Sequence, residues 1–73
     1  MSGVTKRSLS IRGHSTSISL EDGFFDELMR IARDRSLSFA ALVAEIDERR
    51  DRRTNLSSAL RLYVLDDLKS RRA

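Results

Sequence analysis

The fold that the sequence predicts depends most on the stretch His14-Ser15-Thr16-Ser17-Ile18-Ser19-Leu20-Glu21, HSTSISLE in one-letter code. Serine-rich runs are typical of linkers, but here apolar Ile18 and Leu20 alternate with polar residues. Alternation with a period of two is typical of a β-strand with one buried face. We therefore expect a strand rather than a linker. Its polar face would carry Ser15, Ser17 and Ser19.

The residues before this stretch also alternate, but out of phase with it. The apolar residues Leu9 and Ile11 stand at odd positions, whereas those after Gly13 stand at even positions. Such a slip requires a turn or a bulge. A two-residue turn that starts at Gly13 would make a hairpin in which Ile11 pairs with Thr16. One long strand with a bulge at Gly13 explains the slip equally well, so both alternatives stay open.

Three helices are expected after the strand. The first runs from about residue 21 to 35, the second starts at its N-cap Ser38, and the third begins near Thr54 or Asn55. In each segment apolar residues recur at helical spacing, which predicts one buried stripe per helix. The core positions of the strand and the first two helices are Ile18, Leu20, Phe24, Leu28, Ile31, Leu42, Val43 and Ile46. The stripe of the third helix is Leu56, Leu60, Tyr63, Val64 and Leu68.

The composition sets limits on function. A chain of 73 residues is one domain at most, and a core of this size seldom supplies more than about 3–5 kcal/mol without a further support. With no cysteine and one histidine, neither disulfides nor a metal site can give that support, which leaves oligomerisation. We expect no enzyme activity, no cofactor and no metal. No apolar run approaches the roughly 20 residues of a membrane span, so we expect a cytoplasmic protein and no membrane partner.

The distribution of charge points to an anionic partner. Residues 1–20 carry Lys6, Arg7 and Arg12 and no acid, whereas residues 21–48 are strongly acidic. A helix-turn-helix reader is disfavoured because the second helix starts with Phe39 and offers no base in its first two turns. A two-stranded β-ribbon in the major groove of double-stranded DNA agrees better with this charge distribution.

Several motifs together resemble a known family. A strand that ends in Leu20-Glu21, a helix through Leu28 and Ile31, and a second helix opened by Ser38 are similar to the ribbon-helix-helix family, which includes the Arc and methionine repressors. A short bacterial subfamily of mostly unassigned function is more similar still. The matching segments are Gly13-His14, Thr16-Ser17, Leu20-Glu21, the run from Leu42 to Asp47 and the run from Asn55 to Arg61.

The resemblance implies a mainly α fold, an intertwined homodimer whose antiparallel β-ribbon takes one strand from each chain, and operator DNA as the partner. The core positions named above would form a shared dimer core. Base-facing strand residues would be Ser15, Ser17 and Ser19, and the start of the second helix, Ser38 and Phe39, would hold a phosphate. Phosphate or auxiliary contacts would come from Lys6, Arg7, Arg12 and His14.

The expected domain division has three parts: a flexible basic N-terminus over residues 1–8, a ribbon-helix-helix domain over 9–50, and a helix over 54–70 that packs on the same domain. The expected function is transcription regulation. Because the strand face offers only serines, which discriminate weakly between bases, one alternative stays open. It is a dimeric protein-protein interaction module that has lost DNA readout and binds another protein through the third helix or the C-terminus.

Overall fold

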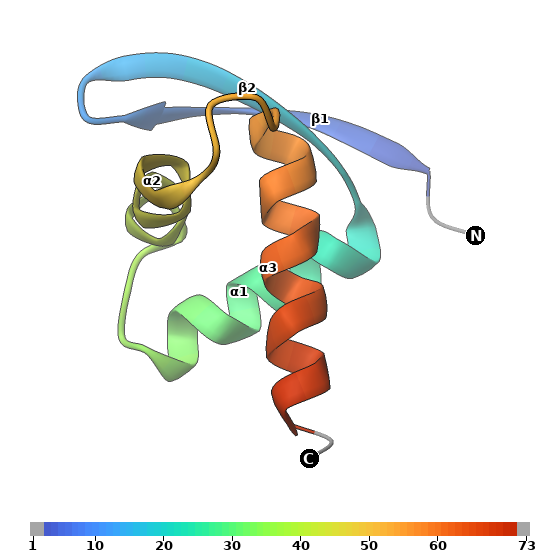
Figure 1. The fold of residues 1–73 in the computed structure, drawn as a ribbon. Coiled ribbons are helices and arrows are strands. Elements are labelled where there is room, and N and C mark those ends of the chain that lie inside the picture. Colours follow the sequence, from blue (N-terminus) through green and yellow to red (C-terminus); the bar gives the residue numbers. More distant parts are fainter. Residues whose placement is uncertain (1–2, 72–73) are drawn as a thin grey trace.

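Two strands precede three helices in the computed structural model, which describes residues 3–71. Figure 1 shows the strands as one antiparallel hairpin above the helices, with α3 running away from the hairpin toward the C-terminus. The elements are β1 (Val4–Ile11), β2 (His14–Glu21), α1 (Asp22–Asp34), α2 (Phe39–Arg49) and α3 (Leu56–Arg71).

The hairpin turn resolves the phase slip around Gly13. Ile11 pairs with His14, so the turn residues are Arg12 and Gly13, with φ of 52° and 80°. Positive φ at both central residues is typical of a type I′ turn, whose twist matches that of the flanking strands. Of the two alternatives, the hairpin is therefore the one present, but its expected pairing of Ile11 with Thr16 is wrong. The turn starts one residue earlier than expected.

The expectation of a flexible segment over residues 1–8 is also wrong for its greater part. Residues 4–8 belong to β1 and pair with β2, from Val4 opposite Glu21 to Ser8 opposite Ser17. The turn at Arg12 and Gly13 sets the register, which places residues 4–8 opposite residues 17–21 of β2. Residues 1 and 2 lie outside the described residues.

Side chains cap the starts of α2 and α3 where the sequence predicts. The Ser38 hydroxyl accepts a hydrogen bond from the Ala41 amide at 3.0 Å, and Asn55 Oδ1 accepts one from the Ser58 amide at 2.8 Å. These bonds satisfy amides that a helix start leaves without partners. After α1 the chain turns through Ser36, whose φ of 57° is left-handed. The second and third helices thus begin at their expected caps.

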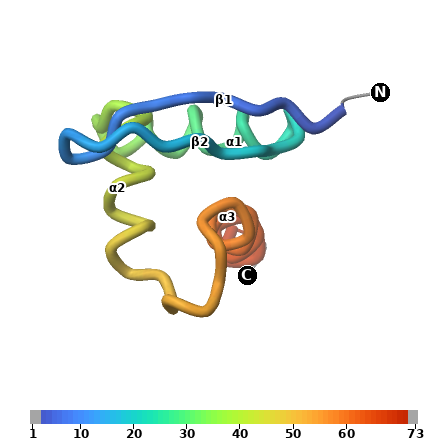
Figure 2. Tube along the Cα trace, turned by 90° about the horizontal axis from the view of Figure 1, so that it is seen from above, coloured from blue at the N-terminus to red at the C-terminus, as the bar shows by residue number. Residues whose placement is uncertain are grey.

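The core lies between the inner face of the hairpin and the three helices. Figure 2, seen from above, shows α2 and α3 on the same side of the hairpin, with α1 beneath the strands. The side chains that are less than 2% exposed come from every element except β1: Ile18, Leu20, Leu28, Leu42, Val43, Leu60 and Val64. Ile31 and Ile46 are also buried, and Phe24 is half-buried against this cluster.

The ribbon in this structure is made by one chain. β1 occupies one edge of β2, and α3 reaches the opposite edge at Ser19. Within the single chain, β2 pairs with β1 in an intramolecular hairpin. The association of two copies stays a proposal.

Candidate nucleic-acid interface

The hairpin has an outer face that the helices leave uncovered. In the observed register, Lys6, Ser8 and Ser10 lie opposite Ser19, Ser17 and Ser15 respectively. We call these six residues the outer face. Five of them are exposed and Ser19 is partly covered. The face therefore consists of small hydroxyl groups and one ammonium, without a carboxylate.

Two of the six residues, Ser8 and Ser10, had no role assigned from the sequence. They alternate with Leu9 and Ile11 just as the downstream serines alternate with Ile18 and Leu20. That alternation was the available signal. The hairpin makes it decisive, because it places the odd apolar residues of β1 on the same face as the even ones of β2.

The edges of the hairpin add backbone donors to the outer face. In a hairpin with a two-residue turn, alternate residues direct their N–H and C=O groups away from the partner strand. In β2 these residues include Ser15 and Ser17, and in β1 they include Ser8 and Ser10. Among residues 3–71, no hydrogen bond satisfies these edge amides. Such amides can donate to phosphate oxygens along the walls of a groove.

Arg7 lies on the opposite side of the hairpin from the outer face. Its guanidinium carbon stands 3.7 Å from the centroid of the Phe25 ring, and its Nη2 lies 3.7 Å from a carboxylate oxygen of Asp22. The Phe25 ring in turn lies 4.9 Å from that of Phe39, the first residue of α2. The structure therefore brings Arg7 toward the start of α2 and separates it from Lys6.

The start of α2 keeps two amides available. Ser38 uses its hydroxyl to cap the amide of Ala41, so this hydroxyl is already engaged. The amides of Phe39 and Ala40 precede the first intrahelical bond, which Leu42 donates to the Ser38 carbonyl at 3.0 Å. The backbone at Ser38 and Phe39 thus has the donors that a phosphate requires.

Arg12 and His14 lie at the tip of the hairpin. Arg12 donates to the Ala44 carbonyl at 3.0 Å and to the Glu48 carboxylate at 2.6 Å, which ties the turn to α2. His14 is exposed and lines a hollow of about 350 Å³ together with Arg12, Ser15 and Arg50. The tip is basic, but Arg12 is largely occupied by the helix.

Acidic side chains near the hairpin are neutralised by arginines. Glu21, at the open end of the hairpin, accepts a hydrogen bond from Arg61 at 2.9 Å, and this bond lowers the pKa of Glu21. At the tip, a hydrogen bond from Arg50 lowers the pKa of Asp47. Both carboxylates stay ionised, and each one is paired with a guanidinium that offsets its repulsion of an anionic partner.

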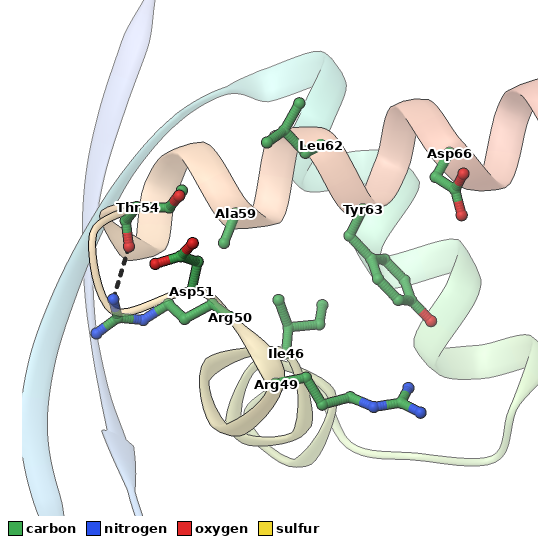
Figure 3. A pocket seen from close by; sticks show the side chains of 9 residues that line it. All are labelled: Ile46, Arg49, Arg50, Asp51, Thr54, Ala59, Leu62, Tyr63 and Asp66. Carbon is green, nitrogen blue, oxygen red and sulfur yellow. Dashed lines mark hydrogen bonds between the residues drawn. The ribbon is translucent and has the colours of Figure 1, made fainter.

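A second kind of surface lies between the helices. A hollow of about 500 Å³ lies between the end of α2 and α3 (Figure 3). Ile46, Ala59, Leu62 and Tyr63 give it an apolar floor. Within residues 3–71, no cluster of histidine, cysteine and acidic residues is arranged to hold a metal ion. No described helix is both long and apolar enough to cross a membrane.

Comparison with known families agrees with this architecture. A family model described as a ribbon-helix-helix domain matches residues 4–68. The chain belongs to the ribbon-helix-helix family. Ribbon-helix-helix proteins typically bind DNA as transcription regulators, and they usually do so as homodimers. Neither a curated protein nor a solved structure matches this ribbon-helix-helix chain significantly.

Proposed function

We propose that this protein is a transcription regulator of the cytoplasm that binds double-stranded DNA as a homodimer. The outer face of its hairpin would enter the major groove, where a two-stranded ribbon fits and base edges can be read. One observation supports this proposal more strongly than the others. The six residues of the outer face are polar, free of carboxylates and mostly exposed, although residues 21–48 are strongly acidic.

The chemistry of this face favours close approach over strong base selection. A serine hydroxyl both donates and accepts, and its short side chain lets the ribbon backbone come near the groove. Serine bonds to several bases, whereas the contact that best selects guanine needs an arginine or a lysine. Lys6 is the residue of the outer face that can make it. We therefore expect modest sequence preference and a large contribution from phosphate contacts.

Phosphate contacts would come from several places beside the outer face. The edge amides of Ser8, Ser10, Ser15 and Ser17 face sideways, and the free amides of Phe39 and Ala40 open at the start of α2. Arg7, on the inner side of the hairpin, lies over Phe25, whose ring adjoins that of Phe39. Arg12 and His14 would act at the tip. Each phosphate neutralised by a charged side chain releases counterions, so the affinity should fall steeply with salt.

A second candidate is a dimeric interaction module that keeps the fold without base readout. The observation that favours it is the exposure of apolar side chains on α3, which lies outside the outer face. In that case Lys6 and the serines would face solvent and would not contact DNA.

Titration with duplex DNA separates the two candidates. Fluorescence anisotropy is measured with a random duplex and with the promoter region of the protein's own gene, each at low and at physiological salt. Binding that weakens steeply with salt, with a preference for the promoter duplex, supports the regulator. Equal affinity for both duplexes would reduce the proposal to non-specific binding. No binding at low salt would reject it.

A further inference from the structure

Glu21 brings a carboxylate to the end of the outer face. Over residues 4–21 it is the sole acidic residue, and it follows Ser19 at the spacing of two that keeps side chains on one side of a strand. Val4, which lies opposite Glu21, is 58% exposed, as a residue on the outer side of the hairpin should be. A duplex on the outer face would therefore meet a negative charge at Glu21.

Glu21 also lies within reach of Lys6. Lys6 is opposite Ser19 in the register, which makes Glu21 its diagonal neighbour across the hairpin. Diagonal neighbours in an antiparallel pair lie about 7–8 Å apart, a distance that long side chains can span. Within residues 3–71 Lys6 has no ion-pair partner, and the Glu21 carboxylate binds Arg61 of α3 instead. The ammonium of Lys6 is thus left available for DNA.

Arg61 binds both Glu21 and the end of β2. Its Nε donates to Glu21 Oε1 at 2.9 Å, and its Nη2 donates to the Ser19 carbonyl oxygen at 3.0 Å. Two hydrogen bonds from one planar guanidinium fix the direction of the side chain that accepts them. Glu21 accordingly lines a hollow together with Val64 and Leu68, so its side chain turns toward α3.

The first turn of α3 holds the same strand residue from its other side. The Ser57 hydroxyl accepts a hydrogen bond from the Ser19 amide at 3.0 Å. Both outward backbone groups of Ser19 are therefore bound by side chains of α3. This contact fixes the distance between Arg61 and the end of the outer face.

The pair of Arg61 and Glu21 has the properties of a charge adjustment more than of a structural support. The two side chains are 30% and 39% exposed, and ion pairs as open to solvent as this one contribute little to stability. The hydrogen bond from Arg61 lowers the pKa of Glu21, so the carboxylate is ionised at neutral pH. Its charge therefore has to be offset whenever an anionic partner approaches.

We infer that Arg61 is a positioning residue for DNA binding, which neutralises Glu21 and holds this carboxylate away from Lys6. The outer face then meets DNA as a basic surface. Arg61 acts through Glu21 and Lys6 and makes no contact with DNA itself. The inference rests on the proposed function, because it requires that the outer face bind a duplex.

Charge substitutions at the two positions test the inference by fluorescence anisotropy with a random duplex at low salt. Arg61→Gln should weaken the affinity by roughly three- to tenfold, the effect of one unpaired charge within a Debye length of several phosphates. The double variant Arg61→Gln/Glu21→Gln should regain the natural affinity. A double variant as weak as Arg61→Gln would mean that Arg61 contacts DNA or only supports the fold, and would overturn the inference.

Glu21→Gln alone gives a readout that does not depend on how Arg61→Gln folds. The Glu21 side chain makes no capping hydrogen bond at the start of α1, so an amide there leaves the helix start intact. This variant should bind DNA more tightly at low salt, and the gain should shrink as salt screens the charge. An unchanged affinity would place Glu21 too far from DNA and would also overturn the inference.

Arg71→Gln is the matched control. Arg71 is likewise an arginine of α3 that binds a carboxylate, at 3.0 Å from Asp67, but it lies in the last turn, away from the hairpin (Figure 1). It should leave the affinity unchanged, whereas a loss equal to that of Arg61→Gln would assign both effects to net charge and refute the inference. If the natural protein binds no duplex, the proposed function fails and this inference with it. If the natural protein and a folded Arg61→Gln variant bind equally well, the inference alone fails.

Discussion

At the scale of single residues, Lys6 offers the simplest test of the proposed DNA contact. It is the basic member of that face and has no ion-pair partner within residues 3–71. We expect Lys6→Ala to weaken binding to every duplex and to reduce the slope of log K against log salt by about 1. Lys69→Ala is the control, because Lys69 is exposed in the last turn of α3. Equal effects of the two variants would mean that DNA binds elsewhere.

Truncation of two neighbouring residues of β2 should affect different properties, DNA binding for Ser17 and stability for Ile18. Ser17 is exposed on the outer face, whereas Ile18 is 1% exposed. Ser17→Ala should change the free energy of unfolding by less than about 0.5 kcal/mol while weakening DNA binding. Ile18→Ala should lower the free energy of unfolding by about 2–5 kcal/mol. Urea unfolding measures both, and a large loss for Ser17→Ala would reverse the assigned faces.

At the scale of elements, the hairpin depends on the turn at Gly13. Gly13 has a φ of 80°, and this left-handed conformation costs an L-residue about 1–2 kcal/mol. The cost is one of backbone strain, because a Cβ at Gly13 would meet no atom within 4 Å. Gly13→Ala should therefore lower the free energy of unfolding by about that amount. Gly23 lies in the first turn of α1, also with open space around it. There, Gly23→Ala should stabilise by about 0.5–1 kcal/mol. A stabilising Gly13→Ala in thermal or urea unfolding would contradict the type I′ turn.

The attachment of α3 to α1 should depend on pH. Asp67 accepts a hydrogen bond from Arg30 at 2.7 Å and another from Arg71 at 3.0 Å. These bonds lower the pKa of Asp67 below its ordinary value of 3.8. A carboxyl whose pKa is lower in the folded state stabilises the fold above its unfolded pKa. That contribution is lost as the pH falls through the folded pKa.

The Asp67→Asn variant tests this dependence. It should be less stable than the natural protein at neutral pH, and its stability should fall less on acidification below pH 3.8. Unfolding by urea at a series of pH values measures the difference. Asp66→Asn is the control, because Asp66 is the exposed neighbour and has no ion-pair partner among the described residues. Identical pH profiles for Asp67→Asn and the natural protein would refute the role of Asp67.

The sequence predicted the elements well because their signals are local. The caps at Ser38 and Asn55 and the alternation around Ile18 each depend on a few neighbouring residues, and the family resemblance agreed with them. The register of the hairpin was not predictable in this way, because Gly13 fits either central position of a turn. The serines of β1 were missed because the choice between a hairpin and a bulged strand stayed open, although either hairpin register places them on the outer face. Arg7 faces inward because it shares the alternation of Leu9 and Ile11, but its contact with Phe25 forms only in the tertiary fold.

At the scale of the whole molecule, the outer face lies on the hairpin, whereas α3 runs away from the strands toward its far end (Figure 1). The proposed homodimer would present two outer faces, so that DNA binding would gain from two contacts at once. We therefore expect the affinity for DNA to be higher at protein concentrations above the dimer dissociation constant than below it. Anisotropy at protein concentrations below and above the dimer dissociation constant measures this. Equal affinity in the two regimes would contradict it.

The most direct measurement is a nuclear magnetic resonance titration of the ¹⁵N-labelled protein with duplex DNA at low salt. The proposed function predicts that the largest shifts occur at the amides of Lys6, Ser8, Ser10, Ser15 and Ser17, with smaller ones at Phe39 and Ala40. Amides in the second half of α3 should barely move. Shifts confined to α3 and the α2–α3 connection, with the hairpin amides unchanged, would contradict DNA binding through the ribbon.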